Sequence, residues 1–241
     1  QKRPFLIDVL GYKPVTKTPR ETKDINQKRS FLLVVKYLDA QLILLIVYSY
    51  NMGNHSSLLL REEEIETIQQ ETGFTPNQNE RLYSRFTSLD KGDNGFLCRE
   101  DFHRIPELAI NPLGDRIVNA FFCESGSEDK LNFRQFMKVL AHFRPVKKDK
   151  ENKLNSREGK LRFAFQMYDT DNDEQISKEE LLGVLQMMVG DNISEEQLVS
   201  IAERTIVEAD KDGDQMISFQ EFCAALERTD VEQKMSIRFL N

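Results

Sequence analysis

Apolar residues recur at helical spacing along most of the chain from residue 58 onward, with charged residues densely placed between them. The segment 58–74, LLLREEEIETIQQETGF, predicts an acidic first helix that ends at Gly73, because glycine readily forms the cap of a helix C-terminus. A later stripe follows the spacing i, i+3, i+4 and i+7 and consists of Leu181, Val184, Leu185 and Met188. The pattern therefore predicts an all-α fold whose helices each bury an apolar face.

Two twelve-residue stretches interrupt the helical pattern and carry acids at the same offsets. Segments 169–180 (DTDNDEQISKEE) and 210–221 (DKDGDQMISFQE) both have Asp at the first, third and fifth places, Ser at the ninth and Glu at the twelfth. Carboxylates this close repel one another unless a cation lies among them, and Ca²⁺ takes roughly six to eight oxygen ligands from such a loop. The spacing is that of the EF-hand loop, and the two loops predict two bound Ca²⁺ ions.

The predicted ligands occupy places 1, 3, 5, 7, 9 and 12 of each loop. In the first they are Asp169, Asp171, Asp173, the carbonyl of Gln175, Ser177 through a water, and a bidentate Glu180; in the second they are Asp210, Asp212, Asp214, the carbonyl of Met216, Ser218 and Glu221. The sixth place usually takes Gly because it needs a positive φ, and Glu174 and Gln215 there are expected to cost roughly 1–2 kcal/mol each. Ile176 and Ile217 at the eighth place predict a short antiparallel bridge between the loops. Acidic helix caps on a solvated surface would explain one such stretch, but not two with repeated spacing.

Two earlier stretches keep the frame of these loops and lose their ligands. Segment 90–101 (DKGDNGFLCRED) has Gly92 at the third place and the shorter Asp101 at the twelfth. Segment 124–135 (ESGSEDKLNFRQ) has Gly126 at the third place and Gln135 at the twelfth, so the bidentate anion is missing. Both are predicted to fold without metal, and weak binding by the first is the alternative.

The chain is therefore expected to form two lobes from four helix-loop-helix units in two pairs, with short β bridges between paired loops. Pro145 stops the preceding helix, and the next dozen residues are almost without apolar side chains, which indicates a linker. The expected boundaries are 52–76 for the N-terminal site and first helix, 77–112 and 113–143 for the degenerate units, 144–159 for the linker, 160–191 and 197–232 for the calcium-binding units, and 233–241 for a tail.

Charge and cysteine content narrow the class of partner. The net charge of −7 divides into about +5 for residues 1–51 and −12 for the remainder, where Asp and Glu outnumber Lys and Arg. An acidic body argues against nucleic acid as a partner and for cations or basic peptides. The three cysteines, Cys98, Cys123 and Cys223, are odd in number and unevenly spaced, as expected for reduced thiols of a cytosolic protein.

Residues 1–51 differ in character from the rest. Their apolar stretch 31–50 is long enough to span a bilayer, but Lys36 and Asp39 bring insertion close to break-even. Met52 then opens MGNHSS, a match to the N-myristoylation pattern with Gly53 as acceptor and Ser57 as the closing hydroxyl. Myristoylation requires Met52 to be the start, so residues 1–51 are expected to be upstream sequence; a genuine N-terminal extension is the alternative.

Several stretches outside the loops carry a family resemblance. ETGF, RLYSRFTSLDKGDNG, REDFHRIPELAINPLGDRIVNAFF, LAHFRP, LNSR and DVEQKMSIRFLN together resemble the calcineurin B homologous proteins over residues 52–241. The resemblance implies a myristoylated, two-lobed EF-hand protein whose third and fourth loops bind Ca²⁺. It also implies a cytoplasmic protein, peripheral on the cytosolic face of the plasma membrane and other membranes. The implied partner is an amphipathic juxtamembrane helix of a plasma-membrane Na⁺/H⁺ exchanger, with roles in exchanger activity and pH regulation, calcineurin inhibition and vesicle traffic.

The apolar stripes beside the intact loops predict either core or a groove for such a helix. Met187 and Met188 suit an adaptable contact surface. The residues predicted to line the groove are Leu181, Val184, Leu185, Met188, Phe222 and Leu226. The alternating tail, with Met235, Ile237, Phe239 and Leu240, is expected either to cover part of this groove or to pack in the core.

An enzyme is not expected. His55, His103 and His142 stand in no metal or triad spacing with the cysteines, and no Gly-rich phosphate loop occurs. The closer alternative is a regulatory subunit of the calcineurin B type, a calcium sensor that binds the catalytic subunit of a phosphatase. Four competent loops would favour that alternative, and a pure calcium buffer is the third possibility.

Overall fold

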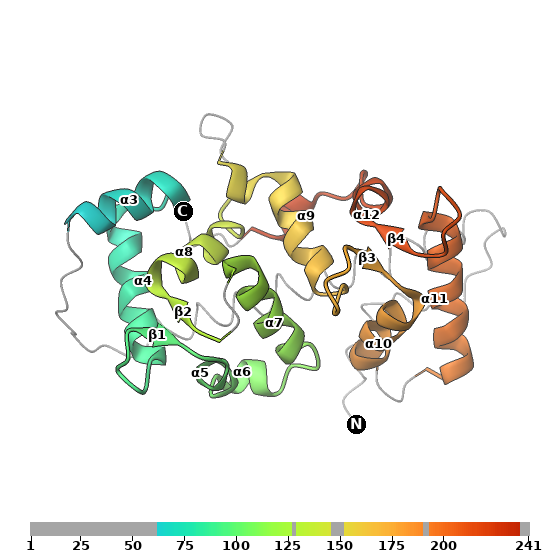
Figure 1. Cartoon of the computed structure of the whole chain (residues 1–241), viewed down its shortest axis with the longest axis horizontal. Helices are drawn as coiled ribbons and strands as arrows, with labels where there is room; N and C mark the ends of the chain where they lie inside the picture. The colour runs from blue at the N-terminus through green and yellow to red at the C-terminus, as the bar shows by residue number, and fades with distance from the viewer. Residues whose placement is uncertain (1–61, 127–128, 146–151, 190–192, 237–241) are drawn as a thin grey trace, which may run out of the picture. The chain divides into compact units, whose positions relative to one another are not determined.

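The computed structural model describes residues 62–126, 129–145, 152–189 and 193–236, and it divides them into two compact units (Figure 1). We call residues 62–167 together with 230–236 the N-unit, and residues 168–229 the C-unit. The expected division fell in the linker 144–159, whereas the observed boundary lies after Met167. The helix that enters the third loop therefore belongs to the N-unit, because its apolar side chains are packed there.

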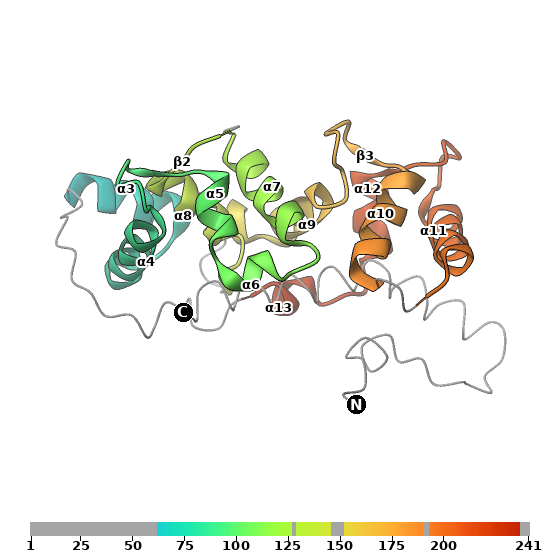
Figure 2. The ribbon, with the colours of Figure 1, turned by 90° about the horizontal axis from the view of Figure 1, so that it is seen from below.

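The N-unit is a helical body around one short β pair. Its elements are α3 (Glu62–Thr72), α4 (Pro76–Leu89), β1 (Phe96–Leu97), α5 (Arg99–His103), α6 (Pro106–Ala109), α7 (Gly114–Ser125), β2 (Leu131–Asn132), α8 (Phe133–Ala141), the 3₁₀ turn η2 (Lys153–Asn155), α9 (Arg157–Gln166) and α13 (Val231–Lys234). Figure 1 shows α3, α4 and α8 packed together, and α7 beside α9. Figure 2 shows α13, which packs against α9.

The C-unit holds the two calcium-type loops. Its elements are β3 (Gln175–Ile176), α10 (Lys178–Val189), α11 (Glu195–Ala209), β4 (Ile217–Ser218) and α12 (Phe219–Ala225). Ile176 pairs with Ile217 in an antiparallel bridge, which confirms the bridge expected at the eighth places. The degenerate loops repeat the arrangement, since Leu97 pairs with Leu131. The all-α EF-hand architecture with two loop pairs is thus confirmed.

Local sequence fixes where the helices begin and end. Thr75 caps α4 in a reciprocal pair of hydrogen bonds with Gln78, and Pro76 occupies the first turn, where its missing N–H has no cost. α3 ends at Thr72, and Gly73 follows with φ 71°, as the sequence predicts for a C-terminal cap. These caps fix the end of α3 and the start of α4.

Aromatic side chains dominate the core of the N-unit. Phe121 and Phe143 both meet the ring of Phe163 edge-on, at centroid distances of 5.9 and 5.0 Å. All three rings are at most 1% exposed. Burial of each such side chain contributes about 1.5–3 kcal/mol, so α7, α9 and the segment directly after α8 are held as one body.

No helix among the described residues is long and apolar enough to cross a membrane. The apolar stretch 31–50, the acceptor Gly53 and the tail positions Ile237, Phe239 and Leu240 lie outside the described residues. Met235 is described and is 1% exposed, so this part of the tail packs in the core.

Candidate calcium sites

The third loop gathers the three aspartates that the sequence assigns to a cation. Carboxylate oxygens of Asp169, Asp171 and Asp173 all lie within 4.8 Å of one another. Asp169 is fixed by the N–H groups of Asp173 and Glu174, which donate to its two oxygens at 3.2 and 3.1 Å. Burial, with the nearby carboxylates of Glu180 and Asp173, raises the pKa of Asp169 above its ordinary value. The loop therefore concentrates negative charge that a bound cation would relieve.

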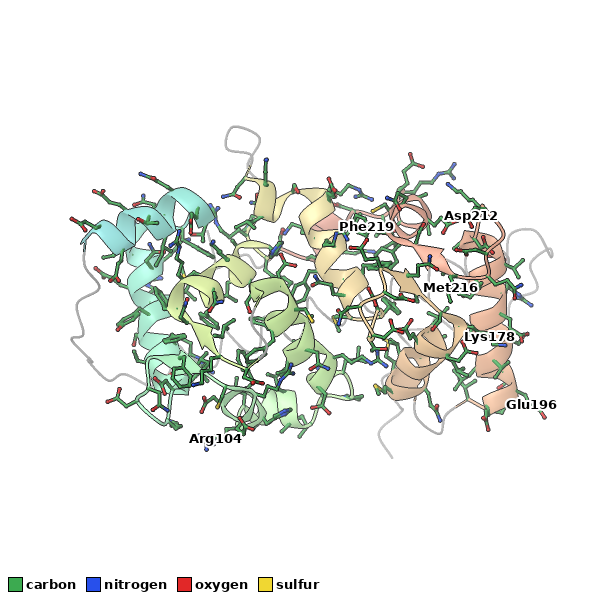
Figure 3. The ribbon with its side chains drawn as sticks, in the orientation of Figure 1. Arg104, Lys178, Glu196, Asp212, Met216 and Phe219 are labelled. Atoms are coloured by element: carbon green, nitrogen blue, oxygen red, sulfur yellow. The ribbon has the colours of Figure 1, made fainter. Side chains whose placement is uncertain are left out.

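The fourth loop repeats the geometry. Oxygens of Asp210, Asp212 and Asp214 also lie within 4.8 Å of one another. Asp210 accepts from the N–H of Gly213 at 2.6 Å and from the N–H of Gln215 at 2.9 Å. Figure 3 places Asp212 in the loop between α11 and β4. In the described part of the chain, these two aspartate triads are the only groups of three or more candidate metal-binding side chains so close together.

The residue at the sixth place of each loop has the positive φ that the EF-hand loop predicts. Glu174 and Gln215 both have φ 67°, in the left-handed region that favours glycine. In each loop the N–H of this residue donates to the first aspartate, Asp169 or Asp210. A hydrogen bond to a charged acceptor, of about 1.5–3 kcal/mol, offsets the backbone strain.

The twelfth-place glutamates close their loops through the backbone. Glu180 Oε1 accepts from the N–H of Thr170 at 2.7 Å, and its Oε2 accepts from the N–H of Ser177 at 2.9 Å. Glu221 makes the same pair of contacts with Lys211, at 2.6 Å, and Ser218, at 2.9 Å. Burial acts to raise the pKa of each glutamate, but these hydrogen bonds together outweigh it and leave the pKa lowered. Both glutamates are thus favoured in the ionised form that a cation needs.

Ligand positions overlap with helix caps in these loops. Ser218 is the N-cap of α12 and Glu221 is its third residue, so places nine and twelve of the loop form a capping box. Asn132 and Gln135 form the same box at the start of α8 in a degenerate loop. The start of the exit helix is therefore fixed by side chains within the loop itself.

Oxygen donors alone make up the predicted ligand sets. The structure brings the three aspartates of each loop together and holds the glutamate on the same loop, with the predicted carbonyl donors Gln175 in β3 and Met216 directly before β4 (Figure 3). Hard carboxylate and carbonyl oxygens without nitrogen or sulfur donors fit Ca²⁺ and disfavour Zn²⁺. The chemistry of both loops therefore fits calcium.

In the first degenerate loop the twelfth-place acid faces a cation of the protein. Asp101 Oδ1 lies 3.1 Å from Nη1 of Arg104, a residue labelled in Figure 3. Asp101 Oδ2 accepts from the N–H of Cys98 at 3.0 Å and from its thiol at 2.9 Å. Burial, with the hydrogen bond to Asp101, raises the pKa of Cys98 to about 11. The anion is already compensated, which favours a loop without metal.

In the second degenerate loop an amide replaces the carboxylate. Gln135 Nε2 donates to the carbonyl oxygen of Ser125 at 3.2 Å, and its Oε1 accepts from the N–H of Asn132 at 2.9 Å. The twelfth residue therefore still ties the second place to the ninth, with one bond reversed in polarity. His142 Nε2 lies 2.9 Å from Oε1 of Glu124, the first-place acid, although this contact lacks hydrogen-bond geometry.

The residues predicted to line a partner groove are buried in this structure. None is more than 4% exposed, and they are Leu181, Val184, Leu185, Met188, Phe222 and Leu226. Their burial follows from the packing of α10 on α11 and from the ring of Tyr168, whose centroid lies 5.9 Å from that of Phe222. Of the methionine pair, Met187 stays 44% exposed. The structure thus shows these side chains as core, the other reading that the stripes allowed, and a helix would reach them only after α10 and α11 move.

Sequence reasoning overlooked a polar cluster in the N-unit centred on Lys160. This lysine is 0% exposed and donates to three main-chain oxygens, two in the segment after α8 and one directly after α13. A usable signal existed, since Lys160 stands one turn before Ala164 on the buried face of α9. A lysine on the apolar face of a helix indicates either that its ammonium has buried hydrogen-bond acceptors or that this part of the face is exposed to solvent.

Comparisons with known proteins identify the family to which this fold and these loops belong. A model described as an EF-hand domain pair matches residues 158–227, which hold both aspartate triads. The chain is also 44% identical over 187 residues to a protein of Naegleria gruberi named as the B subunit of calcineurin, covering 78% of this chain and 99% of that protein. The match supports the calcineurin B family as a whole. The chain belongs to the calcineurin B family of calcium-binding, non-catalytic EF-hand proteins.

Proposed function

We propose that the chain is a calcineurin B-type regulatory subunit that binds an amphipathic helix of a phosphatase catalytic subunit under the control of Ca²⁺. The observation that carries the proposal is the match along 99% of the calcineurin B protein of Naegleria gruberi at 44% identity. Such a match extends well beyond the two calcium loops. The acidic body of the protein further suits a helix with a basic face.

Calcium acts through the C-unit in this proposal, with one ion in each of the loops 169–180 and 210–221. Each aspartate triad stores like-charge repulsion that an ion relieves, and each loop opens an exit helix, α10 or α12. Ion binding therefore removes this repulsion at the first turns of α10 and α12, which carry residues of the predicted groove. Release of Leu185 and Met188 from the core is the step that would expose a contact surface.

The experiment measures phosphatase activity of a calcineurin catalytic subunit that has been freed of its own regulatory partner. The chain is added at increasing concentration, in calcium and in chelator, with a phosphopeptide as substrate. We expect activation in calcium that is lost in the variant carrying Glu180→Gln and Glu221→Gln. The matched control is Glu196→Gln, an exposed acid at the start of α11 outside both loops. Absence of activation and of complex formation on gel filtration would reject this function.

A second candidate is the helix of a Na⁺/H⁺ exchanger, as implied by the resemblance to the calcineurin B homologous proteins. The observation that favours it is the loss of calcium ligands in the N-unit, where Arg104 faces Asp101 and Gln135 takes the place of a glutamate. Titration of the exchanger's juxtamembrane peptide, beside a peptide from the phosphatase catalytic chain, distinguishes the two. Tight binding of the exchanger peptide alone would favour the second candidate.

Leu185→Ala is a suitable groove variant for both titrations. Leu185→Asp or Met188→Asp would place a charge in the core, since these side chains are 3% and 4% exposed. Val207→Ala, at a position 77% exposed on α11, is the matched control. Leu185→Ala itself lowers the melting temperature because it leaves a cavity in the core, so both titrations are run at a temperature where circular dichroism shows the variant folded. Weakened binding in Leu185→Ala alone under that condition would place the partner on the predicted groove.

Membrane attachment forms a separate part of the proposal. If translation starts at Met52, Gly53 carries a myristoyl group, and one such chain gives only marginal and reversible attachment. A bound partner on the cytosolic face would then supply the second contact. Intact mass of the native protein tests both points, and a native peptide that contains Leu45 and Ile46 would reject the start at Met52.

A further inference from the structure

A charged junction inside the N-unit joins the end of α3 to residues 231–236, which comprise α13 and the two residues after it. We call residues 231–236 the C-terminal segment. Lys160 Nζ, on α9, donates to the carbonyl of His142 at 2.5 Å, to that of Arg144 at 3.0 Å and to that of Met235 at 3.0 Å. All three hydrogens of the ammonium group are therefore used, each on a different residue. Two of these acceptors follow α8, and the third follows α13.

Arg144 continues the junction to α3. Its Nη1 donates to the carbonyl of Thr72, the last residue of α3, at 2.6 Å. Its guanidinium lies over the ring of Phe74, 5.2 Å from the centroid. The carbonyl of the same Arg144 accepts from Lys160 and, at 3.4 Å, from the hydroxyl of Ser236. One residue thus contacts the first helix with its side chain and the C-terminal segment with its backbone.

Both cations satisfy helix ends that would otherwise lack partners. The last carbonyls of a helix have no intrahelical donor, and positive charge is favourable there because of the helix dipole. Lys160 serves the carbonyl of His142, the C-cap of α8, and Arg144 serves the end of α3. If either helix end or the C-terminal segment moved away, the buried Lys160 or the half-buried Arg144 would lose an acceptor. Movement of one element therefore weakens the contacts that hold the others.

The surrounding charges leave the carbonyls as the main partners of Lys160. Glu232 is the acid that acts on Lys160, and it lies 2.9 Å from Nη1 of Arg157. Arg144 adds a second positive charge nearby. The position of Lys160 consequently depends on the three main-chain oxygens more than on a carboxylate.

We propose that Lys160 and Arg144 couple the C-terminal segment, residues 231–236, to the packing of α3, so that release of one of these two elements loosens the other. Coupling of this kind is reciprocal by thermodynamic necessity. A partner that takes hold of the C-terminal segment would thereby loosen the helix nearest the N-terminal acylation motif in the sequence. The junction then transmits binding at one end of the described chain to the other.

Hydrogen exchange at two amides tests the coupling in the full chain, measured below pH 7 so that Lys160, whose pKa burial lowers to about 7, keeps its ammonium proton. The N–H of Gly73 bonds to the carbonyl of Gln69, and the N–H of Met235 bonds to that of Val231, both at 2.8 Å. Lys160→Met removes the ammonium from the C-terminal side. Gly73→Ala acts from the α3 side, because a Cβ at Gly73 would overlap Arg144 Nη1 and because φ there is 71°.

Each variant is expected to accelerate exchange at both amides by about tenfold or more, as loss of hydrogen bonds from a charged donor implies. Lys153→Met, an exposed lysine of η2, should leave both amides unchanged, and amides of α10 in the C-unit serve as the internal reference. Acceleration confined to Met235 in the first variant and to Gly73 in the second would overturn the proposal. If Lys160→Met unfolds the N-unit, Gly73→Ala decides alone: faster exchange at Met235 supports the coupling, and unchanged exchange there refutes it.

Discussion

The buried ammonium of Lys160 should give the N-unit a specific dependence of stability on pH. Burial lowers the pKa of Lys160 from 10.5 to about 7, with Glu232 acting to raise it and Arg144 to lower it. The informative perturbation is Lys160→Met, which keeps a long side chain and removes the titrating group. The quantity to compare is the free energy of unfolding of the N-unit in the two proteins across pH.

The sign follows from proton binding in the two states. Between pH 7 and 10.5 the unfolded chain still holds a proton on Lys160 whereas the folded chain has released it, so the free energy of unfolding rises with pH. One pKa unit corresponds to about 1.36 kcal/mol, and the gain between pH 7 and pH 9 is about 2 kcal/mol. Well below pH 7 both states are protonated and the contribution no longer changes. The Met variant lacks this rise, while every other group titrates in both proteins.

Urea unfolding followed by NMR intensities of the methyl groups of Val139 and Leu140 isolates the N-unit, because both side chains are buried in α8. Lys153→Met, at an exposed lysine, should behave as the wild type. Parallel curves for wild type and Lys160→Met from pH 7 to 9 would refute the reasoning. That result would mean that the three carbonyl acceptors offset the desolvation of the ammonium completely.

Three further predictions concern the loops. Glu180→Gln with Glu221→Gln should abolish Ca²⁺ binding at micromolar concentration, because the bidentate anions are lost; two sites found by calorimetry in this double variant would disprove the ligand assignment. Gln135→Ala should lower the stability of the N-unit by about 1–3 kcal/mol, equally in calcium and in chelator, since it removes two side-chain hydrogen bonds and no ion ligand. Gln215→Gly should raise the melting temperature of the C-unit in chelator by relieving up to about 1 kcal/mol of strain at positive φ, whereas Gln220→Gly inside α12 should lower it.

The calcium loops could be read from the sequence because their chemistry depends on short spacing. The aspartates of each triad lie within five residues of one another, and the left-handed conformation at Glu174 and Gln215 follows from the loop frame alone. The pairing of Ile176 with Ile217 also follows, since the eighth place of one loop meets the eighth place of its neighbour. Local constraints therefore carried these predictions.

Features that depend on long-range packing could not be read in this way. A stripe such as Leu181, Leu185 and Met188 has the same spacing in a core and in a binding groove, and only tertiary structure shows that it is buried here. The assignment of α9 to the N-unit depends on which body packs against Phe163 and Phe165. Lys160 meets acceptors 16, 18 and 75 residues away in the chain, a relation that no local pattern encodes.

The overlap of ligands and caps at places nine and twelve separates two requirements that the loop must meet. An exit helix needs only a reciprocal pair of hydrogen bonds at its start, which Asn132 and Gln135 supply as well as Ser218 and Glu221 do. An ion needs the negative charge of the glutamate in addition. A single exchange of carboxylate for amide can therefore silence a calcium loop while its helices, its bridge and its place in the core remain. Point substitutions in one pair of loops can therefore abolish its calcium binding while the helices and the β bridge of that pair keep their structure.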